Sequence, residues 1–228
     1  LYSAAQKVVG MLAIFSGFVA TATLPSLSRL AHSDHQKMGI LLENALKAIF
    51  IAAIPLIAGG FLLKDSIVGF LFGQNYLPAA DTFAILLFSI LAVHPLAIIS
   101  NLLFVFDKQV KMIKYALVSS LSNLILNFLF IPKYGMEGAA SATLISFFIY
   151  IILLWREGKK IYNFKIFSGL IKSAIAALIM GFFTYIFKII DVYIIINIIF
   201  SGIFYFLILY LFKEKLLEEI LEIIKVKK

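Results

Sequence analysis

Seven apolar runs, each close to twenty residues long, follow one another along the 228-residue chain. A hydrocarbon core of about 30 Å requires about 20 residues of α-helix at a rise of 1.5 Å per residue, so each run can cross a bilayer. None shows the polar–apolar alternation over about 10 residues that is typical of barrel strands. We therefore predict an all-α, polytopic membrane helix bundle. The predicted spans are Ala5–Leu27, Leu42–Leu63, Thr82–Phe106, Ile113–Ile131, Gly138–Trp155, Phe167–Ile189 and Val192–Phe212.

The composition excludes several classes of protein. Hydrophobic residues make up 63% of the chain and charged residues 14%, and the mean hydropathy of +1.05 exceeds that of a soluble core. The absence of cysteine excludes a disulfide scaffold, a thiolate nucleophile and a cysteine-ligated metal. The twelve acidic residues form no pair or cluster inside the predicted spans, which argues against an enzyme. His32, Asp34 and His35 share a polar loop without a fourth ligand, so we predict no metal site and no cofactor.

Basic residues alternate in number from one connection to the next. Sixteen of the twenty lie after spans one, three, five and seven, and the other four occupy the intervening positions. Because Lys and Arg accumulate in cytoplasmic loops, we predict a multi-pass protein of the cell membrane with an external first residue and a cytoplasmic carboxyl terminus. The net charge of +8 then reflects contact with anionic membrane lipids, and we expect no nucleic-acid partner.

Two segments outside the predicted spans are also apolar. The connection 64–81 is interrupted by Gly69, Gly73 and Pro78, which indicates a short helix lying along the outer membrane surface. Residues 213–228 place their apolar side chains on one broad helical face with charges opposite. This pattern predicts a cytoplasmic amphipathic tail.

Small residues gather in the stretch PKYGMEGAASATL, between the fourth and fifth spans. We expect Pro132 to end the fourth helix and Gly135 to supply a tight turn. Small side chains at the start of the fifth helix allow close packing, which stabilises helix pairs in lipid. The predicted packing residues are Gly135, Gly138, Ala139 and Ala142.

Polar side chains occur within the third and fourth spans. Asn123 and Asn127 lie four residues apart on one helical face, and Asn101 lies in the third span. Each can face a transport cavity or bond to a neighbouring helix, and the sequence leaves both roles open. Pro55 and the His-Pro pair at His94 free backbone carbonyls at points where we expect the second and third spans to bend.

Four stretches resemble the carboxyl-terminal half of the polysaccharide-biosynthesis flippases. These proteins belong to the superfamily of multidrug and toxin extruders, oligosaccharide flippases and lipid II flippases. The resemblance covers residues 1–155 well and the last two spans by position and hydropathy. It implies that a lipid-linked oligosaccharide, such as a polysaccharide or O-antigen-type repeat unit, is translocated by alternating access as two lobes rock around a cavity. The four stretches are LYSAAQKV, TLPSLSRL, GFLFGQNYLPAADTFAIL and IPKYGMEGAASATLIS.

The resemblance also implies how the chain is divided. Family members have two six-helix lobes, often followed by two further helices. By analogy, residues 1–158 form helices of the carboxyl lobe, residues 159–212 form the two additional helices, and residues 213–228 form the tail. The YSAA segment resembles the second helix of that lobe, so we expect a fragment whose missing partner is the amino-terminal lobe. An odd number of preceding helices agrees with the external first residue predicted from charge.

The lipid-linked substrate implied by the resemblance carries an anionic diphosphate, which needs cationic or hydrogen-bonding partners inside the bilayer. Gln6 and Lys7 lie where similar lipid II flippases carry a basic residue, although AAQK departs from the acid–base pair of those proteins. The alternative for Lys7 is a lysine that extends to the lipid headgroups. The candidate cavity residues are Gln6, Lys7, Asn101, Lys114, Asn123 and Asn127.

Two other functions stay open. A proton- or sodium-coupled drug or metabolite antiporter of the same superfamily would use a carboxylate within the membrane, and the acidic residues here all lie in loops or near span ends. A non-transporting scaffold of a glycan-assembly complex would need neither a carboxylate nor a cavity.

Overall fold

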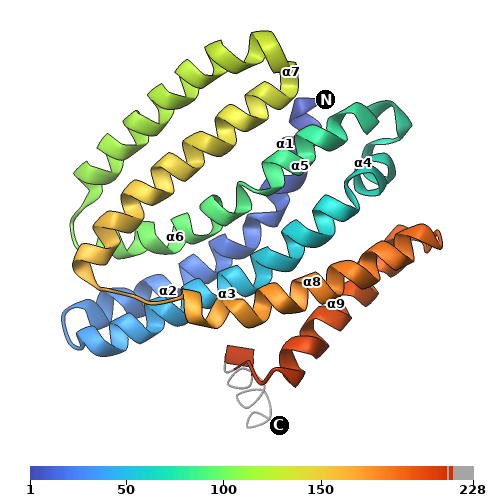
Figure 1. Cartoon of the computed structure of the whole chain (residues 1–228). Coiled ribbons are helices and arrows are strands. Elements are labelled where there is room, and N and C mark those ends of the chain that lie inside the picture. Colours follow the sequence, from blue (N-terminus) through green and yellow to red (C-terminus); the bar gives the residue numbers. More distant parts are fainter. Residues whose placement is uncertain (215, 218–228) are drawn as a thin grey trace.

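The computed structural model describes residues 1–214, 216 and 217, and shows a bundle of helices (Figure 1). Most of the tail predicted at 213–228 lies outside the described residues. The all-α fold predicted from the sequence is confirmed, because the described residues contain helices and no strand. The elements are α1 (Tyr2–Leu12), α2 (Ile14–Ala31), α3 (His35–Leu62), α4 (Lys64–Phe72), the 3₁₀ helix η1 (Gln74–Ala79), α5 (Ala80–Leu87), α6 (Ile90–Val105), α7 (Gln109–Ile161), α8 (Phe167–Ile189) and α9 (Ile194–Leu211).

The long helix α7 is a hairpin of two antiparallel limbs (Figure 1). The hydroxyl of Ser119 donates to the carbonyl of Ser146 at 2.7 Å, although 27 residues separate them. At the open end of the hairpin, the buried carboxylate of Glu157 accepts from Lys111 at 2.7 Å, Lys160 at 2.6 Å and the Tyr115 hydroxyl at 2.9 Å. We call this end of the bundle the basic end and the opposite one the α4 end.

The hairpin decides how many times the chain can cross a membrane. Five helices in the described residues are long and apolar enough to cross, or six if the bent pair η1–α5 and α6 counts as one span. With the two limbs of α7 counted separately, the described residues hold seven crossings, the number predicted from the sequence.

The turn of the hairpin lies at Gly135, whose φ of 54° is in the left-handed region that glycine adopts without strain. The prediction that Pro132 ends the fourth helix is wrong, because Pro132 lies inside α7, three residues before the turn. At Gly138 an added Cβ would lie 2.5 Å from the carbonyl oxygen of Phe130, so the limbs approach too closely for a larger residue. Farther along, Ala142 is buried and Ala139 is half-buried.

Two predicted spans are interrupted along their length. The first is divided into α1 and α2 at Ala13, and the third into α5 and α6 at Phe88–Ser89, where the axis bends by 43°. The sequence predicts this second bend at His94, whereas the His-Pro pair lies inside α6. A proline ring presses on the carbonyl four residues earlier, here that of Leu91, whereas the bend lies six to seven residues before Pro95, where the N–H groups of Phe88 and Ser89 make 3₁₀ hydrogen bonds.

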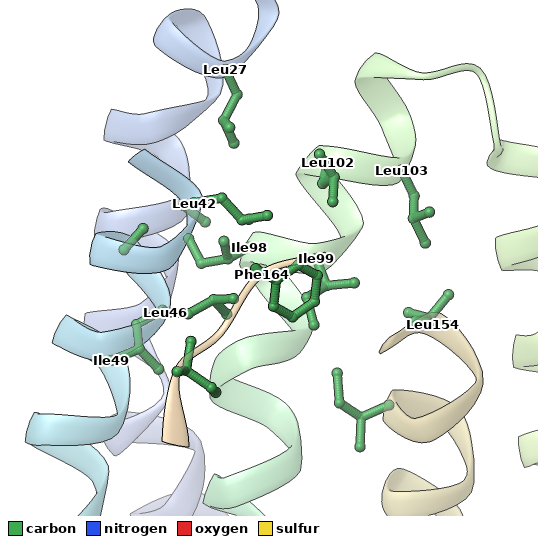
Figure 2. Close-up of a cluster of buried hydrophobic side chains, with 14 of the residues drawn as sticks. Leu27, Leu42, Leu46, Ile49, Ile98, Ile99, Leu102, Leu103, Leu154 and Phe164 are labelled. Carbon is green, nitrogen blue, oxygen red and sulfur yellow. The ribbon is translucent and has the colours of Figure 1, made fainter. Parts of the chain in front are cut away.

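Buried side chains form three clusters between the helices. Near the basic end, Leu42 and Leu46 of α3 lie close to Ile98 and Ile99 of α6, with Phe164 of the α7–α8 linker among them (Figure 2). A second cluster joins α1, α3, α4 and α5 toward the α4 end, and a third joins α3, α8 and α9. Lipid surrounds such a bundle, so close van der Waals contact and interhelical hydrogen bonds hold the helices together.

The α7–α8 linker fastens the last two helices to the bundle. The ring of Tyr162 lies against Gly39 of α3, where any Cβ would overlap it. The carboxylate of Glu43 accepts from the backbone N–H of Lys165 at 2.7 Å. The linker therefore crosses α3 along a fixed path before α8 begins.

The hydroxyl of Tyr205 joins α9 to α3 by a hydrogen bond. Pro55 has no N–H, so the carbonyl of Ile51, four residues earlier, loses its partner within the helix. The buried hydroxyl of Tyr205 donates to this carbonyl at 2.7 Å. Inside a bilayer no water can replace such a bond, so a neighbouring helix has to supply it.

We expect Tyr205→Phe to reduce the free energy of unfolding by about 0.6 kcal/mol, and by at most about 1.7 kcal/mol, the range known for interhelical hydrogen bonds in membranes. Pro55→Ala restores an N–H that can bond to Ile51, so in this background the cost of Tyr205→Phe should approach zero. A double-mutant cycle on the unfolding of the full-length protein measures the difference. Equal costs in both backgrounds would contradict the pairing.

Candidate functional site

An apolar groove of about 740 Å³ lies between α1–α2, α3 and the α8–α9 pair. Lining residues from α1 and α2, such as Met11, Ile14 and Phe18, are exposed, so the groove is open along this side. The other side is closed by half-buried residues of α3 and by buried residues of α5 and α9, such as Phe83, Leu87 and Tyr205. The groove therefore presents hydrocarbon surface on its walls and an opening to its surroundings.

Glycines create part of the space in the groove. Gly59 and Gly60 are adjacent on α3, and an added Cβ at Gly60 would lie 2.8 Å from the side chain of Leu87. Gly202 lines the groove from α9, and a Cβ there would meet no atom within 4 Å. The volume at Gly202 is thus open to a larger side chain without any backbone clash.

A ladder of hydroxyl and amide groups forms the polar part of the α8–α9 contact. Thr184 hydrogen-bonds to the Ser201 hydroxyl at 2.8 Å, and Ser201 donates to the Asn197 side chain at 3.0 Å. Asn197 in turn donates to the carbonyl of Thr184 at 3.2 Å. Asn197, Ser201 and Tyr205 recur every four residues in α9, a signal that the sequence analysis missed. Thr184, Ser201 and Tyr205 supply the polar side chains of the described groove lining.

A smaller polar cavity of about 310 Å³ lies beyond this ladder, at the α4 end. Asn197 and Lys188 line it, and Leu63 lines both cavities. The Lys188 ammonium donates to the carbonyl of Leu62 at 2.9 Å and lies 3.8 Å from Asp65. These contacts close the end of α3, so the charge of Lys188 is already paired.

The predicted residues Gln6 and Lys7 lie on an exposed surface of α1, and neither lines the groove. Among the described residues, Lys7 takes part in none of the ion pairs. Both side chains are therefore available to a partner outside the described chain or to solvent.

The other predicted cavity residues also lie away from the groove. Asn101 donates to the carbonyl of Ala20 at 2.8 Å and so joins α6 to α2. Asn127 donates to Asn123 at 2.9 Å, and both are half-buried on the first limb of α7. Lys114, on the same limb, is exposed. The structure thus brings the α7 residues onto one limb but does not join them to Gln6 and Lys7.

Asp34 has a structural contact in the polar loop before α3. Its carboxylate caps the helix by accepting from the N–H groups of Gln36 at 3.1 Å and Lys37 at 2.9 Å. The hydrogen bond from the backbone of Lys37 lowers the pKa of Asp34. Within the described part of the chain no group of three acidic, histidine or cysteine side chains could hold a metal ion.

His94 has a different environment from that of the other histidines. Its side chain is 0% exposed, and neither ring nitrogen has a hydrogen-bond partner among the described residues. Burying a polar group without a partner costs about 1–3 kcal/mol, so native proteins retain few such groups.

Comparisons with known proteins identify the family to which the sequence is similar. Residues 1–212 match the family described as lipid II flippase MurJ. The chain is 27% identical over 153 residues to the probable low-salt glycan biosynthesis flippase Agl15 of Haloferax volcanii, covering 67% of this chain and 32% of that protein. It is 28% identical over 184 residues to the uncharacterized membrane protein MJ1068 of Methanocaldococcus jannaschii, covering 80% of this chain and 36% of that protein.

The fold is similar to a solved structure of lipid II flippase MurJ in an inward closed conformation. The TM-score is 0.76 with 24% identity, over 92% of this chain and 46% of that one. At this identity the likeness concerns the fold alone. The chain spans about a third of the length of the curated relatives that it matches. The flippase superfamily inferred from the sequence is confirmed, whereas the polysaccharide-biosynthesis branch stays a prediction. Because the family match extends from the first residue to the end of α9, the chain belongs to the lipid II flippase MurJ family.

Proposed function

We propose that this chain forms part of a flippase that moves a lipid-linked oligosaccharide across the membrane by alternating access. The observation that carries the proposal is the apolar groove, which is open on one side and walled by hydrocarbon. A polyprenyl or acyl chain needs such a surface, because its transfer from lipid into a polar cavity would expose apolar area. Membership of the family supports the same substrate class.

The groove and the charged residues divide the proposed substrate into two parts. The hydrocarbon tail lies in the groove, while the diphosphate and sugar lie toward the exposed surface of α1, which carries Gln6 and Lys7. Lys7 attracts the diphosphate at this surface, where a second lobe would complete the cavity. Among the described residues the groove lining contains no carboxylate, which favours a lipid substrate over an ion-coupled antiporter.

The charges at the two ends of the bundle support an orientation. Lys111, Arg156 and Lys160 lie at the basic end, which we assign to the cytoplasm. At the α4 end the Lys64 ammonium pairs with Asp81, and this hydrogen bond raises the pKa of Lys64. The proposed substrate therefore enters near the basic end and leaves near α4.

Gly202→Trp tests the groove. The indole fills open volume without a backbone clash, so the protein should fold while the rate of lipid flipping falls at least about tenfold. The full-length variant is assayed by growth in a host depleted of its own flippase, at matched expression. Ile203→Trp is the matched control, because Ile203 is exposed on α9 and does not line the groove. Equal growth of both variants would refute the groove as the tail site.

Lys7→Ala tests the headgroup surface. Loss of the ammonium should weaken the apparent affinity for the lipid-linked sugar by about tenfold, whereas Lys7→Arg keeps the charge and should largely preserve complementation. Lys133→Ala is the control, because it removes the same charge from an exposed lysine that has no part in the proposed site. Normal complementation by Lys7→Ala would contradict the proposed role. Lys7 would then be a lysine that extends to the lipid headgroups.

Single cysteines test the orientation, because a membrane-impermeant maleimide labels only external positions of intact cells. Asn75, which is exposed in η1, should be labelled without permeabilisation. Asn163, which is exposed in the α7–α8 linker, should be labelled only after permeabilisation. The reverse pattern would overturn the charge-based orientation.

A further inference from the structure

His94 lies where two interrupted spans meet. It belongs to the second turn of α6, and its ring lies beside the backbone of Leu12, the last residue of α1, where neither ring nitrogen meets the geometry of a hydrogen bond. The imidazole is thus completely buried next to the end of α1. A buried polar group without a partner calls for an explanation, and a second conformation in which the ring bonds to this carbonyl would supply one.

The two interruptions lie at the same level of the bundle. The half-helix α1 packs on α5, and α2 packs on α6, so each span contributes one half to each pair (Figure 1). Ala13 separates α1 from α2, and Phe88–Ser89 separates α5 from α6. A common level allows α1 and α5 to tilt together against α2 and α6.

Both interruptions have the same local chemistry. At the first, the buried hydroxyl of Ser16 donates to the carbonyl of Ala13 at 2.7 Å. At the second, the buried hydroxyl of Ser89 donates to the carbonyl of Leu86 at 2.6 Å. In each case a serine satisfies the carbonyl three residues before it, which holds the helix away from regular geometry.

The second interruption also has 3₁₀ hydrogen bonds. The N–H of Phe88 donates to Ile85 at 3.2 Å, that of Ser89 to Leu86 at 3.0 Å, and that of Leu91 to Phe88 at 3.2 Å. A 3₁₀ stretch within a longer helix often marks a functional hinge, because its weaker geometry changes readily.

We propose that the joints at Ala13 and Phe88–Ser89 form one hinge and that His94 is its positioning residue. When α1 and α5 tilt toward α6, the imidazole donates to the Leu12 carbonyl and holds the second state. The unpaired imidazole destabilises the described state, and the new hydrogen bond stabilises the other. The proposal rests on the chain acting in a flippase, where the tilt would open or close the α4 end.

Two substitutions separate this role from simple packing. His94→Leu removes the donor and should favour the described state, so the melting temperature should rise while lipid flipping slows at least about tenfold. His94→Gln keeps a donor and should retain most of the flipping rate. If His94 only fills space, His94→Leu should retain more of the flipping rate than His94→Gln. The reason is that the apolar side chain of Leu would replace an unpaired imidazole better than a second polar group would.

Spin labels measure the hinge without any transport assay. In a cysteine-free, full-length background, labels at Asn75 near α5 and at Ser33 after α2 should give two distance populations by pulsed electron resonance in lipid nanodiscs. In the His94→Leu variant, mainly one of these two distance populations should remain. Labels at Ser33 and Asn163, both at the basic end, are the control and should give one unchanged distance. If Leu fails to fold, Ser16→Ala with Ser89→Ala should likewise shift the populations.

The outcomes are distinct. A single distance in the parent protein, or populations that His94→Leu leaves unchanged, would overturn the hinge. A His94→Leu variant that flips lipid at the parent rate would overturn the positioning role. If the parent protein moves no lipid, the proposed function fails, while the label distances still decide whether the hinge exists.

Discussion

The structure depends on satisfying backbone carbonyls where no water is present. Pro55 removes one donor from α3, and the Tyr205 hydroxyl, 154 residues from its acceptor, replaces it. The same requirement explains why Asn101 bonds to the carbonyl of Ala20 and why Ser16 and Ser89 bond to carbonyls within their own helices. In a soluble protein water would fill some of these positions, and the helices would be freer to separate.

The sequence predicts the elements of this fold well because one constraint, the thickness of hydrocarbon, sets the length of each apolar run. It predicts the turn of the α7 hairpin because Gly135 has few alternatives at a positive φ. It does not predict where spans one and three break. The joint at Ala13 has neither Gly nor Pro, and the second bend lies six to seven residues before Pro95, beyond the carbonyl that the proline ring would press on. The local sequence favours a break in the helix, while packing against neighbouring helices determines the residue at which the break occurs.

The candidate site was harder to predict, for a physical reason. Charged and hydrogen-bonding side chains are rare in an apolar sequence, so they were the residues predicted to line a cavity. Lys7, Asn123 and Asn127 are examples. The groove is instead formed by residues that are common everywhere in the chain, and by the absence of side chains at Gly60 and Gly202. Empty space is a property of several helices packed together, so no single span reveals it. The recurrence of Asn197, Ser201 and Tyr205 was the one readable signal, since it marks the face of α9 that meets α3 and α8.

The hairpin of α7 is closed by contacts between residues at most 46 apart, whereas the groove needs residues from both ends of the chain. During synthesis on the ribosome, the hairpin can therefore form before the groove. The hairpin can complete its Glu157 cluster while α8 is still being made, but the Ile51 carbonyl waits for Tyr205 until α9 has entered the bilayer. A chain that stops before α9 retains a carbonyl in α3 without the hydrogen bond from Tyr205. Until then α3 contains a backbone acceptor that, among the described helices, only α9 supplies with a donor.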